Sequence, residues 1–316
     1  TYQANWLRKK YNLTKLNILD GPFHWVLNAT RKVNGFFKDI FLSSSIHFFR
    51  SSEKKKRLFI NPSNPNHTIK EVRVMIQGWI FSAIKCLVHE NANVENYTPT
   101  MQDVLLKIKN CAKNNALAAS VYLYMLLWQI IFIMCDCENN ETGSFETFNK
   151  CKDMLAYVFA SCNSYMYMRN YHEGKHQWMK MCSELRVAIE KHLFVFKTQH
   201  GKYVWRDLMV EITNKDARSM FGHRDRPHLT EQMHKVIGSY EHDGTLDNIL
   251  HVRHRCHETV GGRKRGGKKG SRTSATDKYL IVVMAKSFTW AEGNALWKPC
   301  NERANSDEWA GVGLNV

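Results

Sequence analysis

The stretch that decides the fold is residues 116–135, ALAASVYLYMLLWQIIFIMC, which runs for twenty residues without a charged side chain. A helix of this length and composition is long enough to cross a bilayer. It contains Ser120 and Gln129, however, and the apolar stretch at 154–168 alternates with charged segments. A helix that is buried on all sides within a large helical domain has the same sequence pattern. We expect such a core helix, and a membrane protein spanning at 116–135 is the alternative.

The segments around this stretch carry apolar residues at helical spacing. Thr68 followed by Glu71 matches a capping box and predicts a helix start. Extended structure is expected in the apolar run that ends at Asp20 and in YLIVVMAKSFTW, residues 279–290. The predicted fold class is mainly α, a long helical domain with a few strands. We expect helices over 23–37, 68–90, 99–134, 144–168, 171–196 and 204–221.

The composition indicates a folded, strongly basic protein. Apolar residues make up 44% of the 316 residues, with 6 prolines, which argues against general disorder. The net charge of +16 and the pI near 9.4 favour a polyanionic partner, most often nucleic acid. The nine cysteines are an odd number without the spacing of a disulfide framework, which suits a reducing compartment.

A basic segment near the C-terminus is the strongest chemical signal. It is rich in glycine and charge, so it predicts a flexible arm rather than a packed element. Its cations can neutralise phosphates without reading sequence, and such a run also serves as a nuclear-import signal. The alternative is a solvated linker without a ligand. We divide the chain into a helical domain (1–245), this basic arm (246–276) and a short C-terminal tail (277–316). The candidate phosphate-binding residues are Arg253, Arg255, Arg263, Lys264, Arg265, Lys268, Lys269 and Arg272.

Several familiar catalytic and cofactor-binding motifs are missing from the sequence. The cluster His251, His254, Cys256 and His257 lacks the two-knuckle spacing of a zinc site. No phosphate-binding loop, dinucleotide fingerprint or G-x-S-x-G motif occurs. Zinc chemistry, nucleotide hydrolysis and serine hydrolysis are therefore disfavoured.

A polar stripe lies in YVWRDLMVEITNKDARSM, residues 203–220. On a helix, Asp207, Glu211 and Lys215 fall on one face. Metal-dependent phosphoryl transfer needs two or three carboxylates, and Asp207 and Glu211 could supply part of such a site, with Asp20 as a distant partner. The alternative without catalysis is a surface ion pair between Glu211 and Lys215, which are four residues apart. Spacing alone leaves both interpretations open.

Two blocks of the sequence resemble a family of transposon-derived proteins of animal and fungal genomes, known as a domain of unknown function. The first block, G-x-F-H-x-x-x-N, runs from Gly21 to Asn28, and the second, D-L-x-x-E-x-x-N-K, runs from Asp207 to Lys215. The resemblance covers roughly residues 15–225. It implies descent from a transposase-like protein with a remnant of an RNase-H-like core, interrupted by a long helical insertion.

The resemblance also implies which residues belong to the site. Asp20, His24, Asp207 and Glu211 are the expected catalytic residues, and Asp20 and Glu211 the expected ligands of Mg²⁺ or Mn²⁺. The expected function is nucleic-acid binding in the nucleus, with DNA favoured over RNA, and with or without residual metal-dependent strand cleavage or transfer. The alternative is a non-enzymatic nucleoprotein or chromatin-associated module.

Overall fold

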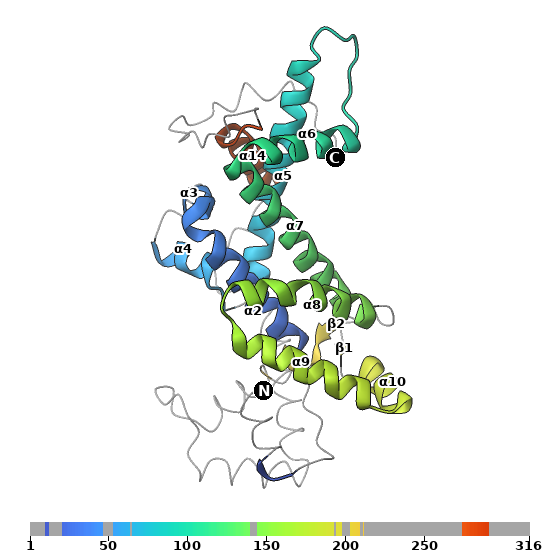
Figure 1. The fold of residues 1–316 in the computed structure, drawn as a ribbon. Helices are drawn as coiled ribbons and strands as arrows, with labels where there is room; N and C mark the ends of the chain where they lie inside the picture. Colours follow the sequence, from blue (N-terminus) through green and yellow to red (C-terminus); the bar gives the residue numbers. More distant parts are fainter. Residues whose placement is uncertain are drawn as a thin grey trace, which may run out of the picture.

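The structure, a computed structural model, describes residues 10–12, 21–46, 53–63, 65–139, 144–192, 194–197, 203–208, 211 and 274–290. Helices dominate this part of the chain, as predicted (Figure 1). The elements in chain order are α2 (Pro22–Phe37), η1 (Lys38–Leu42), α3 (Ser43–Ile46), α4 (Glu53–Ile60), α5 (Pro65–Glu90), α6 (Met101–Asn114), α7 (Ala116–Asp136), η2 (Cys137–Asn139), α8 (Ser144–Ser161), α9 (Tyr165–Lys180), α10 (Ser183–His192), β1 (Val195–Lys197), β2 (Tyr203–Trp205) and α14 (Ser274–Ser287).

Helix α7 lies at the centre of the bundle and contacts α2, α5, α6 and α8. Tyr124 and Trp128 on its inner face are fully buried. The expectation of burial on all sides is wrong, because Leu123, Leu126 and Ile133 on the opposite face are exposed. By length and composition, α7 and residues Thr68–Glu90 of α5 are both apolar enough to cross a membrane, with mean hydropathies of 2.0 and 1.2. Because core helices of soluble proteins can have the same length and hydropathy, these two helices are only weak evidence for a membrane protein.

A buried polar network ties α2 to α7 and α4. The side chain of Asn34 on α2 is fully buried. Its Oδ1 accepts hydrogen bonds from the Tyr124 hydroxyl (3.0 Å) and the Trp128 indole (3.2 Å). Its Nδ2 donates to the carbonyl of Phe59 at 3.0 Å. Because every polar atom in this cluster has a partner, the network fixes how the three helices meet.

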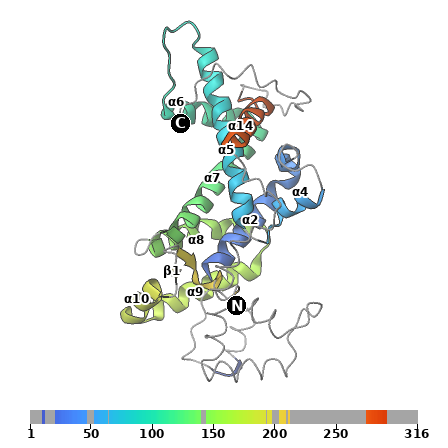
Figure 2. The same cartoon turned by 180° about the vertical axis from the view of Figure 1, so that it is seen from behind.

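Helix α14, the last helix among the described residues, packs along α5, as two opposite views show (Figure 1 and Figure 2). The backbones approach closely at Gly78, where a Cβ atom would lie 2.4 Å from the Cβ of Met284. Beyond α14, the indole of Trp290 donates to the carbonyl of Trp79 at 2.7 Å, and both side chains are fully buried. The prediction of extended structure at 279–290 is therefore wrong for the helical part. Within the predicted tail, Met284, Phe288 and Trp290 are fully buried.

Several helix boundaries differ from the prediction. Helix α5 begins at Pro65, and the Thr68 hydroxyl inside it donates to the carbonyl of Phe59, so Thr68 is not the cap. The predicted helix 99–134 is two helices, because the side chain of Asn115 caps α7 by accepting from the Ala118 amide at 2.9 Å. The predicted helix 171–196 likewise divides into the end of α9, α10 and β1.

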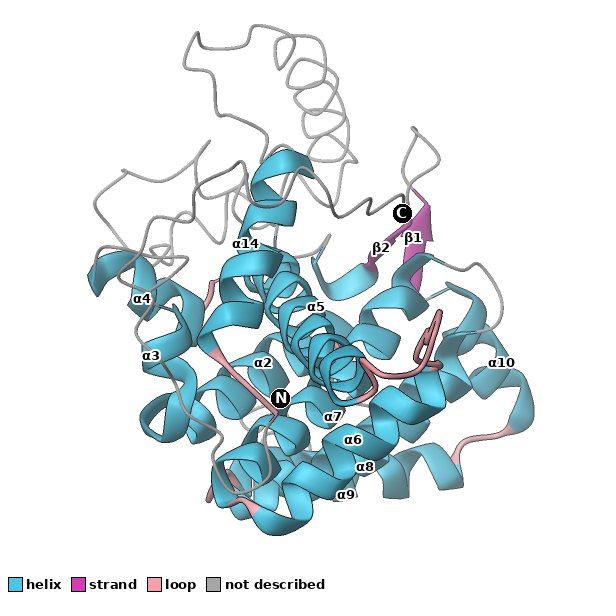
Figure 3. Ribbon diagram, turned by 90° about the horizontal axis from the view of Figure 1, so that it is seen from above, coloured by secondary structure: helices cyan, strands magenta, loops and turns pink. Residues whose placement is uncertain are grey.

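A short antiparallel hairpin of β1 and β2 lies at the periphery of the bundle (Figure 3). Val195 pairs with Trp205 and Lys197 pairs with Tyr203. The predicted helix at 204–221 thus starts later, since residues 203–205 form β2 and residues 206–208 are helical. This two-stranded sheet is all the sheet that the described residues contain. The RNase-H-like core therefore stays a prediction.

Candidate functional site

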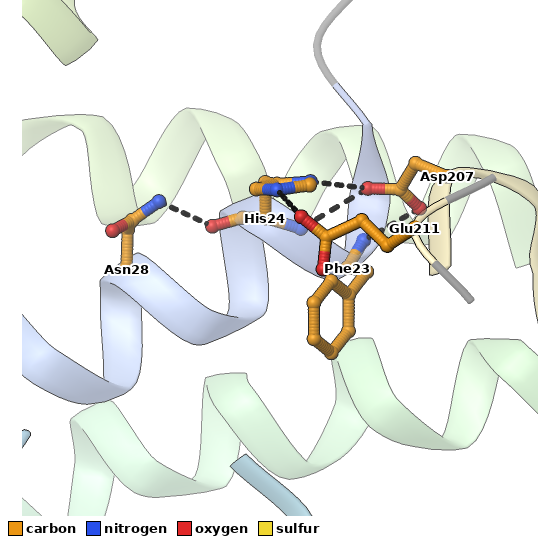
Figure 4. Close-up of polar contacts among 5 residues, drawn as sticks. All are labelled: Phe23, His24, Asn28, Asp207 and Glu211. Carbon is orange, nitrogen blue, oxygen red and sulfur yellow. Dashed lines mark hydrogen bonds and ion pairs between the residues drawn. The ribbon is translucent and has the colours of Figure 1, made fainter. Parts of the chain in front are cut away.

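Three of the four predicted catalytic side chains meet in one cluster (Figure 4). His24, on the first turn of α2, lies between two carboxylates of the segment after β2. Its Nδ1 is 2.9 Å from Oδ2 of Asp207, and its Nε2 is 2.8 Å from Oε1 of Glu211. The side chains of His24 and Glu211 are about half exposed (46% and 51%), whereas Asp207 is 18% exposed. The cluster therefore has a solvent-facing side formed by His24 and Glu211.

Asp207 also caps helix α2 from a distant part of the chain. Its two carboxylate oxygens accept hydrogen bonds from the backbone amides of Phe23 and His24, both at 3.2 Å. These amides are among those that a helix N-terminus leaves without partners, and the positive end of the helix dipole favours a carboxylate there. Gly21 makes room for this contact, because a Cβ at Gly21 would lie 2.0 Å from Oδ2 of Asp207.

The hairpin holds Asp207 in this place. Trp205, at the end of β2, is 2% exposed, and its ring lies 6.3 Å from the ring of Phe23 on α2. The Trp205 amide donates to the carboxylate of Glu138, just after α7, at 3.3 Å. Burial raises the pKa of Glu138, and the bond from Trp205 opposes that rise. A packed tryptophan two residues ahead of Asp207 thus fixes where the carboxylate points.

The geometry favours a protonated imidazole. Both ring nitrogens of His24 face carboxylate oxygens, and an imidazole donates from both nitrogens only as the imidazolium. The hydrogen bond to Asp207 is the main cause that raises the pKa of His24 above 6.5; partial burial opposes it, and the charges of Asp207 and Glu211 add to it. The geometry thus favours a proton at Nε2 that is shared with the half-exposed carboxylate of Glu211.

Two hollows adjoin the N-terminus of α2, and Gly21 lines both. The smaller, of about 430 Å³, is lined by His24 and Asn28 of α2 and by Asn170 of α9. The larger, of about 500 Å³, is lined by Asp207 together with residues of α8, α9 and α10. The His24 cluster therefore adjoins enough space for a ligand.

The remaining predicted site residues are not placed in this cluster. Asp20 lies outside the described residues, as does Lys215, the suggested ion-pair partner of Glu211. The same is true of the basic arm and of all eight of its candidate phosphate-binding residues. Within the described residues, no group of three or more His, Cys, Asp and Glu side chains is arranged to hold a metal ion. The predictions of a metal pair and of phosphate contacts from the arm remain untested.

A second polar cluster beside the larger hollow was not predicted. The Tyr171 hydroxyl donates to Asp153 of α8, and Lys175 of α9 pairs with the same carboxylate at 3.0 Å. Tyr171 and Lys175 are four residues apart, so the sequence indicates that they share a helix face. Nothing in the local sequence indicates that Asp153, on another helix, joins them.

Comparison with protein-family models, with curated proteins and with solved structures gives no match. The resemblance over residues 15–225 therefore stays a prediction.

Proposed function

We propose that this chain is a nucleic-acid-binding protein of transposon descent, with its functional site at the His24, Asp207 and Glu211 cluster. The observation that carries the proposal is the meeting of the two resembling blocks. Gly21 of the first block precedes α2, and His24 and Asn28 lie in its first two turns. Asp207 and Glu211 of the second block pair with His24 there. Local spacing gives no reason for this contact, since 183 residues separate His24 from Asp207.

The charge of the chain supports nucleic acid as the partner. A net charge of +16 attracts a polyanion, and binding that depends on displaced counterions weakens steeply with salt. DNA is preferred over RNA as the partner because of the proposed descent, and the nucleus is the proposed location. In the alternative, a non-enzymatic nucleoprotein, the cluster only shapes a binding surface.

The described residues fit a bound Mg²⁺ or Mn²⁺ only in part. These ions take oxygen ligands, and Glu211 offers a half-exposed carboxylate. Both oxygens of Asp207 already accept hydrogen bonds from amides of α2. One carboxylate falls short of the two or three that metal-dependent phosphoryl transfer uses. We therefore assign no step to a metal ion.

Residual strand cleavage is the second candidate function, favoured by the exposure of His24 and Glu211. The imidazolium of His24 is oriented by Asp207, and its Nε2 faces the carboxylate of Glu211, where both side chains are about half exposed. Such a group can protonate the leaving oxygen of a phosphodiester while Glu211 accepts a proton from a water molecule that attacks the phosphorus, so that one P–O bond forms as the other breaks.

The test is binding of the purified chain to labelled duplex DNA across a salt series, with and without Mg²⁺ or Mn²⁺. A second protein carries glutamine at the eight arm positions named above. We expect tight binding at low salt. The log–log salt slope should be smaller in the arm variant, by about 0.9 for each phosphate that the arm no longer neutralises. Absence of binding by the unaltered chain at low salt would overturn the proposal.

The same reactions test cleavage. Glu211→Gln is expected to abolish nicking and to leave binding unchanged. Glu95→Gln, on an exposed loop between α5 and α6, is the matched control for the change in charge. Binding without nicking in the unaltered chain would reject the cleavage function and retain the nucleoprotein.

A further inference from the structure

The larger hollow has the character of a ligand site. Its volume of about 500 Å³ lies within the range of small-molecule sites, roughly 300–1,000 Å³. It is lined by residues of α8, α9 and α10 and by Asp207. It therefore shares Asp207 with the proposed functional site, whereas His24 is not among its lining residues.

One wall of this hollow is aromatic. Trp178 of α9 and Phe145 of α8 are partly buried, and their rings lie 4.9 Å apart at an angle of 40°. Phe194, before β1, packs edge-on against Phe145 at 5.2 Å. Rings that line a hollow and keep part of their surface exposed offer a stacking surface for a flat ligand.

The rest of the lining carries both signs of charge. Lys150 pairs with Glu146 at 2.7 Å, and Lys175 pairs with Asp153 at 3.0 Å. A lining with paired charges is a poor receptor for a bare anion and a poor receptor for a hydrocarbon. It suits a flat ring whose edge holds both hydrogen-bond donors and acceptors, which is the chemistry of a nucleobase.

Gly174 keeps this hollow open. It lies inside α9, where glycine is less favourable than alanine by about 0.5–1 kcal/mol. It lines the hollow, and a Cβ placed on it would meet no atom within 4 Å. The packing of the helix therefore does not require glycine there, and only a side chain longer than that of alanine would fill the hollow.

We infer that this hollow binds an unpaired nucleobase, stacked on Trp178 and edged by the paired charges of α8 and α9. The inference rests on the proposed function for the source of the base, a single strand bound at the His24 cluster. A free mononucleotide carries the same ring and is the other possible source. Stacking of this kind contributes to single-strand binding without strong sequence preference.

The experiment uses 2-aminopurine, a fluorescent base whose emission falls when it stacks on tryptophan. Three probes are compared on the full chain: 2-aminopurine riboside monophosphate, a single-stranded oligonucleotide with one internal 2-aminopurine, and a non-fluorescent oligonucleotide with an abasic position in its place. We expect quenching of at least one fluorescent probe. If the strand is the source, the abasic oligonucleotide should bind more weakly than the oligonucleotide with the base.

Two variants locate the effect. Gly174→Leu should fill the hollow and abolish quenching, whereas Gly174→Ala is the matched control and should retain it. Trp178→Leu should weaken binding by about 5- to 150-fold, which corresponds to removing one stacked base. Thermal melts verify that each variant folds. Gly174→Leu leaves the contact between the rings of Trp178 and Phe145 in place, so it tests the hollow without removing that contact.

The outcomes separate this inference from the proposed function. In one outcome the chain binds duplex DNA but quenches no fluorescent probe, or quenches it equally well after Gly174→Leu. This result overturns the nucleobase site and leaves the proposal of nucleic-acid binding in place. Quenching of the mononucleotide that disappears in Gly174→Leu, without any binding of nucleic acid, retains the nucleobase site and rejects the proposed function.

Discussion

His24 is the residue on which the site depends, because it connects an exposed carboxylate to a helix cap. Its pKa is raised chiefly by the hydrogen bond to Asp207. We expect the imidazole of His24 to titrate above 6.5 in an NMR pH series. Asp207→Asn should lower that pKa more than Glu211→Gln does. If the pKa of His24 were the same in the unaltered chain and in both variants, the pairing of His24 with these carboxylates would be contradicted.

The same proton links the site to stability. Because the folded-state pKa of His24 exceeds its ordinary value, the pairing with Asp207 stabilises the fold fully below pH 6.5, and this stabilisation disappears as the pH rises through the raised pKa. Unfolding free energy measured by urea titration should therefore fall over that interval, and by less in Asp207→Asn. The half-exposed position of His24 keeps this effect small.

Gly21 is the residue whose replacement tests the helix cap. A Cβ there collides with the carboxylate of Asp207, so Gly21→Ala should displace the cap and lower stability by about 0.5–2 kcal/mol. It should also return the pKa of His24 toward 6.5. Gly35→Ala on the same helix is the control, because a Cβ at Gly35 meets no atom within 4 Å. That variant should be slightly stabilised, and equal melts for the two would refute the capping role of Asp207.

At the scale of elements, the packing of α14 on α5 is a close helix pair and has its own test. Gly78→Ala places a methyl group 2.4 Å from the Cβ of Met284 and 2.9 Å from the carbonyl of Ile281. Overpacking of this kind costs about 1–3 kcal/mol. Thermal denaturation should show this destabilisation, with Gly174→Ala as the unhindered control in α9. A neutral Gly78→Ala would mean that α14 does not pack on α5 in solution.

Helix α14 also marks the limit of prediction from sequence. The core helix at 116–135 and helix α2 follow from the length and spacing of their apolar residues. In 279–290 the neighbouring Ile281, Val282 and Val283 suit a strand, and a short apolar run does not distinguish a strand from a buried helix. Residues 274–287 are helical and pack closely against Gly78 of α5, a contact that local spacing does not reveal.

The site could be predicted only in part, for a similar reason. Spacing placed Asp207 and Glu211 on one helix face, and the resemblance added His24. The nitrogens and oxygens that pair could not be derived, since 183 residues separate His24 from Asp207. The nucleobase hollow could not be predicted either, because Trp178 and Phe145 belong to different helices.

At the scale of the whole molecule, Asn34 is the polar centre of the bundle. Asn34→Leu would leave the Tyr124 hydroxyl and the Trp128 indole buried without their acceptor. Each such group costs about 1–3 kcal/mol. We expect a destabilisation in that range for each, measured by urea unfolding. Asn91→Leu is the control, since Asn91 makes its hydrogen bond locally at the end of α5. Similar stability for both variants would show that the network does not hold the helices together.

The position of α14 has a consequence for the synthesis of the chain. Ser82 on α5 donates to the carbonyl of Phe288, and 206 residues separate them. At roughly 5–20 residues per second, about 10–40 s of translation pass between the two. During that interval the face of α5 around Gly78 and Trp79 lacks its cover. The nascent chain therefore exposes this apolar face of α5 until α14 has been synthesised, and we expect it to depend on chaperones over that interval.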